Sequence, residues 1–201
     1  MEEGEPSASG RLSSRPLDGS GRLHASPRAR GAMVRDLRPQ VTTTAWVAFT
    51  ILWIVATAAS FRFLSYGLVQ AVLAGLMLAA LHWAALFVHH FGHALAARSS
   101  GHPMVGVRLR WWLGTSLYPR DEVVLPAATH IRRALGGPLA SIGFALVASG
   151  LALALRSQGN ALWIGSAFVA LDSLFVFGVG SVIPLGFNDG STLIRWSTKR
   201  G

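Results

Sequence analysis

The sequence predicts an all-α polytopic membrane protein with about four transmembrane helices, and three observations carry this prediction. Hydrophobic residues make up 51% of the 201-residue chain and charged residues only 13%, whereas a soluble domain carries about 25% charged residues. Each helix of a soluble bundle would need a polar face toward water, and none of the apolar stretches has one. Four stretches are almost free of charge and reach the roughly 20 residues that a helix needs to cross the hydrocarbon core: 41–60, 65–88, 134–155 and 161–188.

The first 40 residues differ in composition from the rest of the chain. They are rich in Ser, Gly, Pro and Arg and contain few large apolar residues, which is typical of a disordered segment. We therefore divide the chain into a disordered basic N-terminal tail, 1–40, and a membrane domain, 41–201.

Basic residues mark one side of the predicted membrane domain. Six arginines fall between the second and third apolar stretches and three cations follow the fourth, while Arg62 and Arg156 are alone in the other two connections. By the positive-inside rule, the N-terminus, the long loop and the C-terminus are cytoplasmic. Arginines beside membrane helices are expected for anchoring, so no nucleic-acid partner is predicted. Arginine outnumbers lysine 17 to 1, which favours a GC-rich bacterial genome and a bacterial cell membrane.

The long loop changes its hydrophobic period. Val105, Val107 and Leu109 alternate with polar residues and glycine, as in a strand with one apolar face. We expect a small cytoplasmic β-hairpin between helices two and three, with strands over 104–118 and 121–125. The four helices are expected over about 42–60, from 68 to about 97, from the Gly-Gly-Pro at 136–138, and from 161 to a break near Pro184.

The most informative segment is His89-His90-Phe91-Gly92-His93, at the end of the second apolar stretch. His89 and His93 are four residues apart, so on a helix they share one face and can bind one metal ion. The spacing is that of the zinc-protease motif H-E-x-x-H, with His90 at the glutamate position. Because the chain contains no cysteine, a metal would take nitrogen and oxygen ligands.

Asp189 is the natural third ligand, since catalytic zinc usually takes three protein ligands. The second and fourth helices both run toward the cytoplasm and end there, so His89, His93 and Asp189 should lie at similar depth. This holds although about 96 residues separate His93 from Asp189. Proline and glycine around Asp189 allow the backbone to bend toward the metal.

Three motifs in the same order resemble those of the site-2 protease family of intramembrane zinc metalloproteases. The family's H-E-x-G-H-A-x-A-A-R resembles 89–98 at every position except the glutamate, and its A-G-P-x-A-N resembles 136–141, with Ser141 in place of Asn. Its N-x-x-P-x-x-P-L-D-G-G resembles 181–191, where serines replace the leading Asn and the closing Gly. The similarity covers roughly residues 68–195.

The resemblance implies a zinc ion held by His89, His93 and Asp189. It also implies hydrolysis of peptide bonds in or near transmembrane segments, so the expected partners are the lipid bilayer and membrane-protein substrate segments. In the family, the glutamate takes a proton from zinc-bound water and passes it to the leaving amine. The catalytic candidate at that position is His90, and three interpretations stay open: a base, an additional ligand, or the mark of a site that no longer catalyses.

The sequence therefore predicts a zinc-dependent intramembrane metalloprotease-like protein. The alternative is a non-catalytic pseudoprotease that binds metal or membrane-protein segments. A third hypothesis, metal transport, would use two further ionisable residues of the apolar stretches, His82 and Asp172. His82 lies on the same helix face as His89, about 10 Å deeper, where we expect an interhelical hydrogen bond or a polar path. Asp172 lies up to about 25 Å from Asp189 along a straight helix, too far to share its metal.

Overall fold

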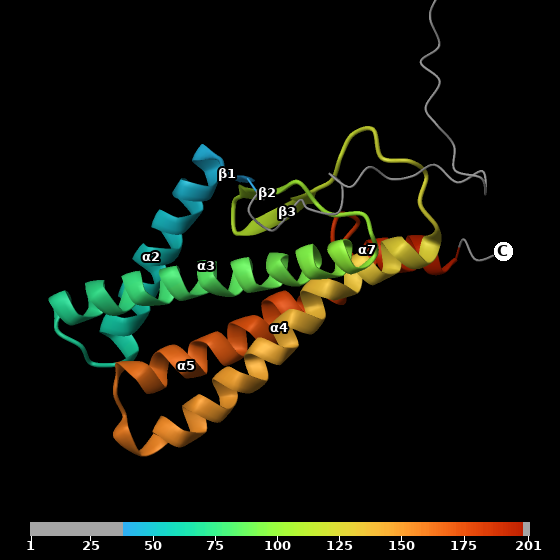
Figure 1. Cartoon of the computed structure of the whole chain (residues 1–201). Coiled ribbons are helices and arrows are strands. Elements are labelled where there is room, and N and C mark those ends of the chain that lie inside the picture. Colours follow the sequence, from blue (N-terminus) through green and yellow to red (C-terminus); the bar gives the residue numbers. More distant parts are fainter. Residues whose placement is uncertain (1–37, 199–201) are drawn as a thin grey trace, which may run out of the picture. The chain divides into compact units, whose positions relative to one another are not determined.

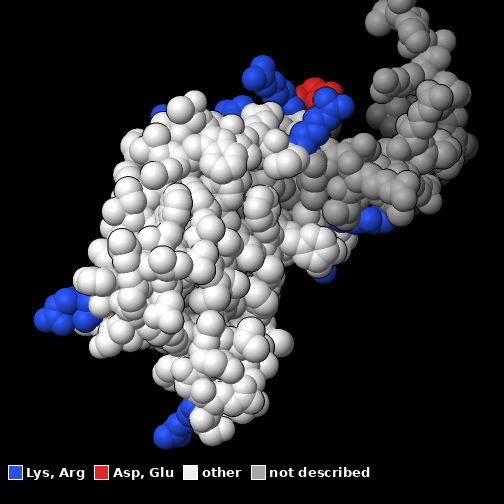
Figure 2. Space-filling view, turned by 90° about the vertical axis from the view of Figure 1, so that its left-hand side faces the viewer, with Lys and Arg blue, Asp and Glu red and all other residues white. Residues whose placement is uncertain are grey.

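The structure is a computed structural model that describes residues 38–198 (Figure 1). Four helical spans are long and apolar enough to cross a membrane: Thr43–Phe63, Leu68–Ser99, Ala127–Gln158 and Ala161–Val182. On the face drawn in Figure 2, the broad middle of the helices carries no charged side chain. The predicted class, a largely helical multi-pass membrane protein with a small sheet between its second and third membrane helices, is confirmed.

The spans correspond to a short series of elements. The first two are the helices α2 (Thr43–Phe63) and α3 (Leu68–Ser99). The third is α4 (Ala127–Leu155), which the 3₁₀ turn η2 (Arg156–Gln158) extends. The fourth joins α5 (Ala161–Leu171), the π-helical segment η3 (Asp172–Val179) and α6 (Gly180–Val182). Helix α7 (Asp189–Ser197) follows after a short loop.

Helices α3 and α4 pack together at the centre of these elements, and α4 also contacts α5, η3 and α7. At their crossing the two backbones touch. A Cβ atom at Gly92 would lie 2.3 Å from the Gly136 carbonyl oxygen, and one at Gly136 would lie 2.5 Å from the Gly92 carbonyl oxygen. Small residues permit such close approach between membrane helices, and here it places the histidine face of α3 directly on the backbone of α4.

The sheet has three strands in the order β1-β2-β3. Strand β1 (Arg38–Val41) is parallel to β2 (Gly106–Arg110), which is antiparallel to β3 (Leu113–Leu117). Strand β1 was not predicted, and it contains residues 38–40 of the predicted tail. The rest of that tail, 1–37, lies outside the described residues.

The hairpin exists, but the predicted partner strand over 121–125 is wrong. The segment 104–118 turns back on itself at Trp111 and Trp112, between β2 and β3. Trp111 adopts φ +55°, the left-handed conformation that closes a two-residue hairpin turn. This conformation usually belongs to Gly or Asn, so a Trp-Trp pair gave no turn signal.

The third membrane helix begins at Ala127, nine residues before the predicted start at 136. The charges of Arg132 and Arg133 suggested a loop, yet Arg133 is only 4% exposed and is ion-paired. Pro138 lies inside α4 and removes only one backbone N–H, a loss that membrane helices tolerate.

The predicted break near Pro184 is confirmed. Helix α6 ends at Val182, and Asn188 caps α7 by accepting the Ser191 N–H at 3.3 Å. Asp189 is the first residue of α7, where the partial positive charge of the helix N-terminus favours a carboxylate.

Candidate metal centre

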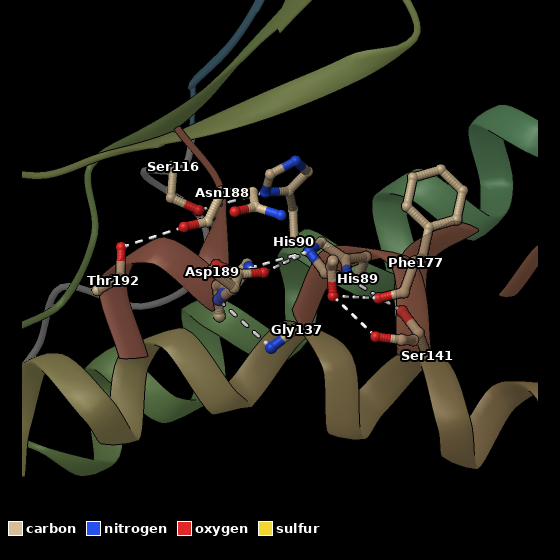
Figure 3. A network of polar contacts seen from close by, with 12 residues as sticks. His89, His90, Ser116, Gly137, Ser141, Phe177, Asn188, Asp189 and Thr192 are labelled. Carbon is tan, nitrogen blue, oxygen red and sulfur yellow. Dashed lines mark hydrogen bonds and ion pairs between the residues drawn. The ribbon is translucent and has the colours of Figure 1, made fainter. Parts of the chain in front are cut away.

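Two histidine nitrogens and one carboxylate oxygen converge between α3 and α7. The Nε2 atoms of His89 and His93 are 3.0 Å apart, and each lies 3.3 Å from Oδ2 of Asp189. These are the three residues expected from the sequence, and their candidate ligand atoms lie within 4.8 Å of one another. Figure 3 shows His89 and Asp189 meeting in this way.

Hydrogen bonds on the far side of each ring explain why the Nε2 atoms face inward. His93 Nδ1 donates to the Arg133 carbonyl at 2.8 Å. The Gly137 N–H also lies 3.3 Å from this nitrogen and would require it to accept, but the contact with the carbonyl is the shorter one, so we assign Nδ1 as the donor. A donating Nδ1–H leaves the lone pair of a neutral imidazole on Nε2.

His89 is held in a matching way by Ser141. The Ser141 hydroxyl lies 3.1 Å from His89 Nδ1 and can accept its hydrogen, which gives the same tautomer. Two Nε2 lone pairs then face each other at 3.0 Å, an arrangement that repels unless a proton or a cation lies between them. Orientation of metal-binding histidines by such second hydrogen bonds is usual in zinc proteins.

The carboxylate of Asp189 is suited to join them. Burial by itself disfavours the charged carboxylate, but the interactions with His89 and His93 outweigh it and lower the pKa of Asp189 to about 2. An ionised oxygen ligand with two imidazole nitrogens is a donor set that suits Zn²⁺. The residues present therefore fit the metal that the sequence predicts.

His90 turns away from this cluster and toward the sheet (Figure 3). Its Nδ1 lies 3.2 Å from the Ser116 hydroxyl of β3. Its Nε2 is buried without a hydrogen-bond partner in the described part of the chain, and a Cβ atom added to Gly114 would lie 2.0 Å from it. In this conformation His90 is a wall of the site rather than a member of the three-residue group.

A cavity of about 560 Å³ opens onto the cluster. Strand β3 forms one wall, η3 and α6 form another, and the loop before α7 closes the third side. Tyr118, Glu122 and Arg133 lie on the wall that the long loop and the start of α4 supply. A volume of this size lies within the usual range of ligand pockets in proteins.

Sequence reasoning missed the ion pair on this wall. Glu122 accepts two hydrogen bonds from Arg133, which lowers the pKa of Glu122. The Arg133 guanidinium also lies 4.1 Å from the centre of the Tyr118 ring. Burial raises the pKa of Tyr118 to about 12, so its hydroxyl stays protonated. The sequence did contain a signal for the position of Arg133, because this residue lies four residues before Gly137 and eight before Ser141, on the same face of α4.

The remaining candidates lie elsewhere. His82 makes an interhelical hydrogen bond, as expected, and its partner is Asp172 at 3.1 Å. His130 belongs to α4, lines the cavity and stacks on Trp196 with 4.0 Å between ring centres.

Gly137→Ala is expected to abolish metal binding while the helices still form. A Cβ atom there would lie 2.3 Å from His93 Nε2 and 2.7 Å from His89 Nε2, so both rings would have to leave their positions. Zinc content of the purified variant measures the effect. Gly143→Ala on the same helix is the matched control, because a Cβ there meets no atom within 4 Å. Equal zinc content in the two variants would contradict the geometry of the cluster.

The fold and the cluster together define a class: a multi-pass membrane protein with a possible metal-binding group formed by its second membrane helix and a segment after its fourth. The structure is similar to that of the Site-2 Protease from Methanocaldococcus jannaschii, with a TM-score of 0.53 and 18% sequence identity. The match covers 83% of this chain and 70% of that chain. The likeness is one of fold. No protein-family model matches the sequence, and a search of curated proteins found no match.

Proposed function

We propose that this protein is a zinc-dependent intramembrane metalloprotease, or a pseudoprotease that retains the same metal site. The observation that carries the proposal is the pair of oriented imidazoles facing one carboxylate oxygen, at 3.3 Å each, beside a cavity. His89, His93 and Asp189 would hold the ion. Bound zinc supplies Lewis acidity toward a water molecule and a peptide carbonyl.

The proposed substrates are membrane-protein segments that unwind locally. Strand β3 is an edge of the sheet and lines the cavity through Gly114, Thr115 and Ser116. An unwound segment needs partners for its backbone N–H and C=O groups within the bilayer, and a free strand edge supplies them. The edge of β3 would thus align a peptide along the cavity, next to the metal ligands.

The alternative, a pseudoprotease, rests on one specific observation. Proton transfer requires a basic group within hydrogen-bond reach of the reacting atoms, and the group at the usual position is His90. Its Nδ1 faces Ser116 and its Nε2 faces Gly114. A catalytic His90 would have to rotate from this position toward the three ligands.

The proposed setting is the cell membrane of a bacterium, with the described C-terminal helix on the cytoplasmic side. Support comes from the arginines of the long loop and of the segment after the fourth span. The metal cluster would then lie close to the cytoplasmic surface, since α3 ends at Ser99, six residues beyond His93.

For the test, the purified protein is supplied with zinc and reconstituted in liposomes. The substrate is a synthetic transmembrane peptide that carries labels at both ends. Cleavage by the wild type, lost in His89→Ala and kept in the loop control His102→Ala, is the result expected for a protease. Zinc and peptide binding without cleavage would favour the pseudoprotease. If neither zinc nor peptide binds to the folded protein, both forms of the proposal fail.

A further inference from the structure

A second polar pair lies within the membrane-spanning helices, away from the metal ligands. His82 of α3 and Asp172 of η3 are 7% and 8% exposed, and His82 Nδ1 lies 3.1 Å from both carboxylate oxygens. A hydrogen lies between the ring and the carboxyl group whichever of the two carries it. Each group thus has a hydrogen-bond partner, which makes burial of the pair among apolar helices tolerable.

The other nitrogen of His82 reaches the sheet. Nε2 lies 3.4 Å from the carbonyl oxygen of Trp112, in the turn between β2 and β3. A carbonyl group only accepts, so Nε2 is the donor in this contact. His82 lies in the middle of the candidate span Leu68–Ser99, so a bilayer around this span would enclose the hairpin turn, which was expected from the sequence to lie at the cytoplasmic face. Irregular backbone at such depth requires a partner for each polar group, and His82 supplies one.

The same turn carries a strained residue. Trp111 holds a left-handed φ of +55°, which is costly for a side chain larger than that of Asn or Gly. Strained conformations persist where the surrounding structure holds them. The contact from His82 to the next residue, Trp112, is such a restraint, and both strands of the hairpin begin or end at this turn.

The pair is separated from the metal cluster by an apolar ring. Phe177, 2% exposed, lies with its ring centre 5.2 Å from that of His82 and 5.7 Å from that of His89. No polar chain through the described residues at this point joins His82 to His89, and the pair is not part of the three-residue ligand group. Its effect on the site must come through the elements that it holds together.

We propose that His82 and Asp172 form a positioning pair that fixes the membrane-inserted β2–β3 hairpin as a wall of the cavity. Asp172 orients the imidazole from η3, and the imidazole donates to the hairpin turn. Strand β3 then keeps Gly114 and Ser116 against His90. The inference deepens the proposed function, because β3 is the wall to which we assign the substrate, but the placement of the hairpin can be measured without any activity.

Hydrogen exchange of the β2–β3 amides, followed by mass spectrometry of the full chain in detergent, tests the proposal. In His82→Ala these amides should exchange about tenfold faster, as expected for the loss of one hydrogen bond to a buried group. His82→Gln keeps a side-chain donor and should remain close to the wild type. His102→Ala and Asp121→Asn are loop controls that should change nothing.

A double variant that swaps the two residues, His82→Asp with Asp172→His (the exchanged pair), separates a positioning role from a role in helix packing. It restores the interhelical hydrogen bond, but the carboxylate at position 82 has no hydrogen for the Trp112 carbonyl. We expect its melting temperature to return toward that of the wild type while the hairpin still exchanges fast. Recovery of both properties would show that the pair only joins two helices and would overturn the proposal, as would unchanged exchange in His82→Ala.

Zinc content and peptide cleavage are measured on the same samples. If the wild type binds no zinc and cuts nothing, the proposed function fails, yet the exchange rates still decide the role of the pair. If His82→Ala proves too unstable to purify, the comparison between His82→Gln and the exchanged pair decides it.

Discussion

Asp189→Ala is expected to lower zinc content from about one ion per chain, the number that one three-ligand site holds, to near zero. The variant removes the carboxylate ligand, and the chain offers no cysteine to replace it. The remaining imidazoles would face each other at 3.0 Å without an anion to balance a divalent cation. Changes in the groups that only orient a ligand cost about 10- to 100-fold in metal affinity, so the loss of a ligand should exceed that. Metal analysis of the detergent-purified protein measures it.

Two further variants test whether the loss of zinc depends on the geometry of the three-residue group. Ser141→Ala removes only the hydroxyl beside His89 Nδ1 and should weaken zinc binding by about 10- to 100-fold. Asp121→Ala, a change in the loop, should keep full occupancy. Zinc retained by Asp189→Ala together with His89→Ala would place the metal elsewhere and remove the basis of the proposed function.

The meeting of His89, His93 and Asp189 was accessible from sequence because it depends on topology alone. Four apolar stretches fix the direction of each helix, so residues at the ends of the second and fourth must lie at the same depth. The helix break near Pro184, before Asp189, was also visible in the sequence. Assignment of the three residues as zinc ligands stays a prediction that metal analysis tests.

The hairpin and the start of α4 were not accessible in this way. The Trp111–Trp112 turn lacks Gly or Asn, and the residue that contacts it from outside the hairpin is His82, about 30 positions earlier in the chain. Likewise, Arg133 reads as a loop residue until Glu122 and the Tyr118 ring come together around it. In both cases the partner lies outside the residue's own strand or helix, so the hydrophobic pattern of that element alone does not reveal it.

His90→Glu is expected to raise the rate of peptide cleavage by about 10²- to 10⁴-fold, the usual contribution of a positioned general base. A glutamate side chain places its carboxylate on a flexible stem, whereas the His90 ring is fixed between Ser116 and Gly114. The new carboxylate would be free to turn from the sheet toward the cavity, beside the ion. Cleavage of the labelled transmembrane peptide, at equal zinc content, measures the gain.

His90→Gln is the matched control for this gain, because it has nearly the shape of glutamate but no basic oxygen. It should stay at or below the wild-type rate. A gain in His90→Glu alone would identify the native chain as a pseudoprotease whose metal site and cavity are intact. If the wild type cleaves the peptide and both His90→Gln and His90→Ala do not, His90 is instead the base. The His90 ring must then leave Ser116 when substrate binds along β3. A zinc-loaded His90→Glu variant that binds peptide and remains inactive would contradict both accounts, because the ion, the base and the substrate would all be present.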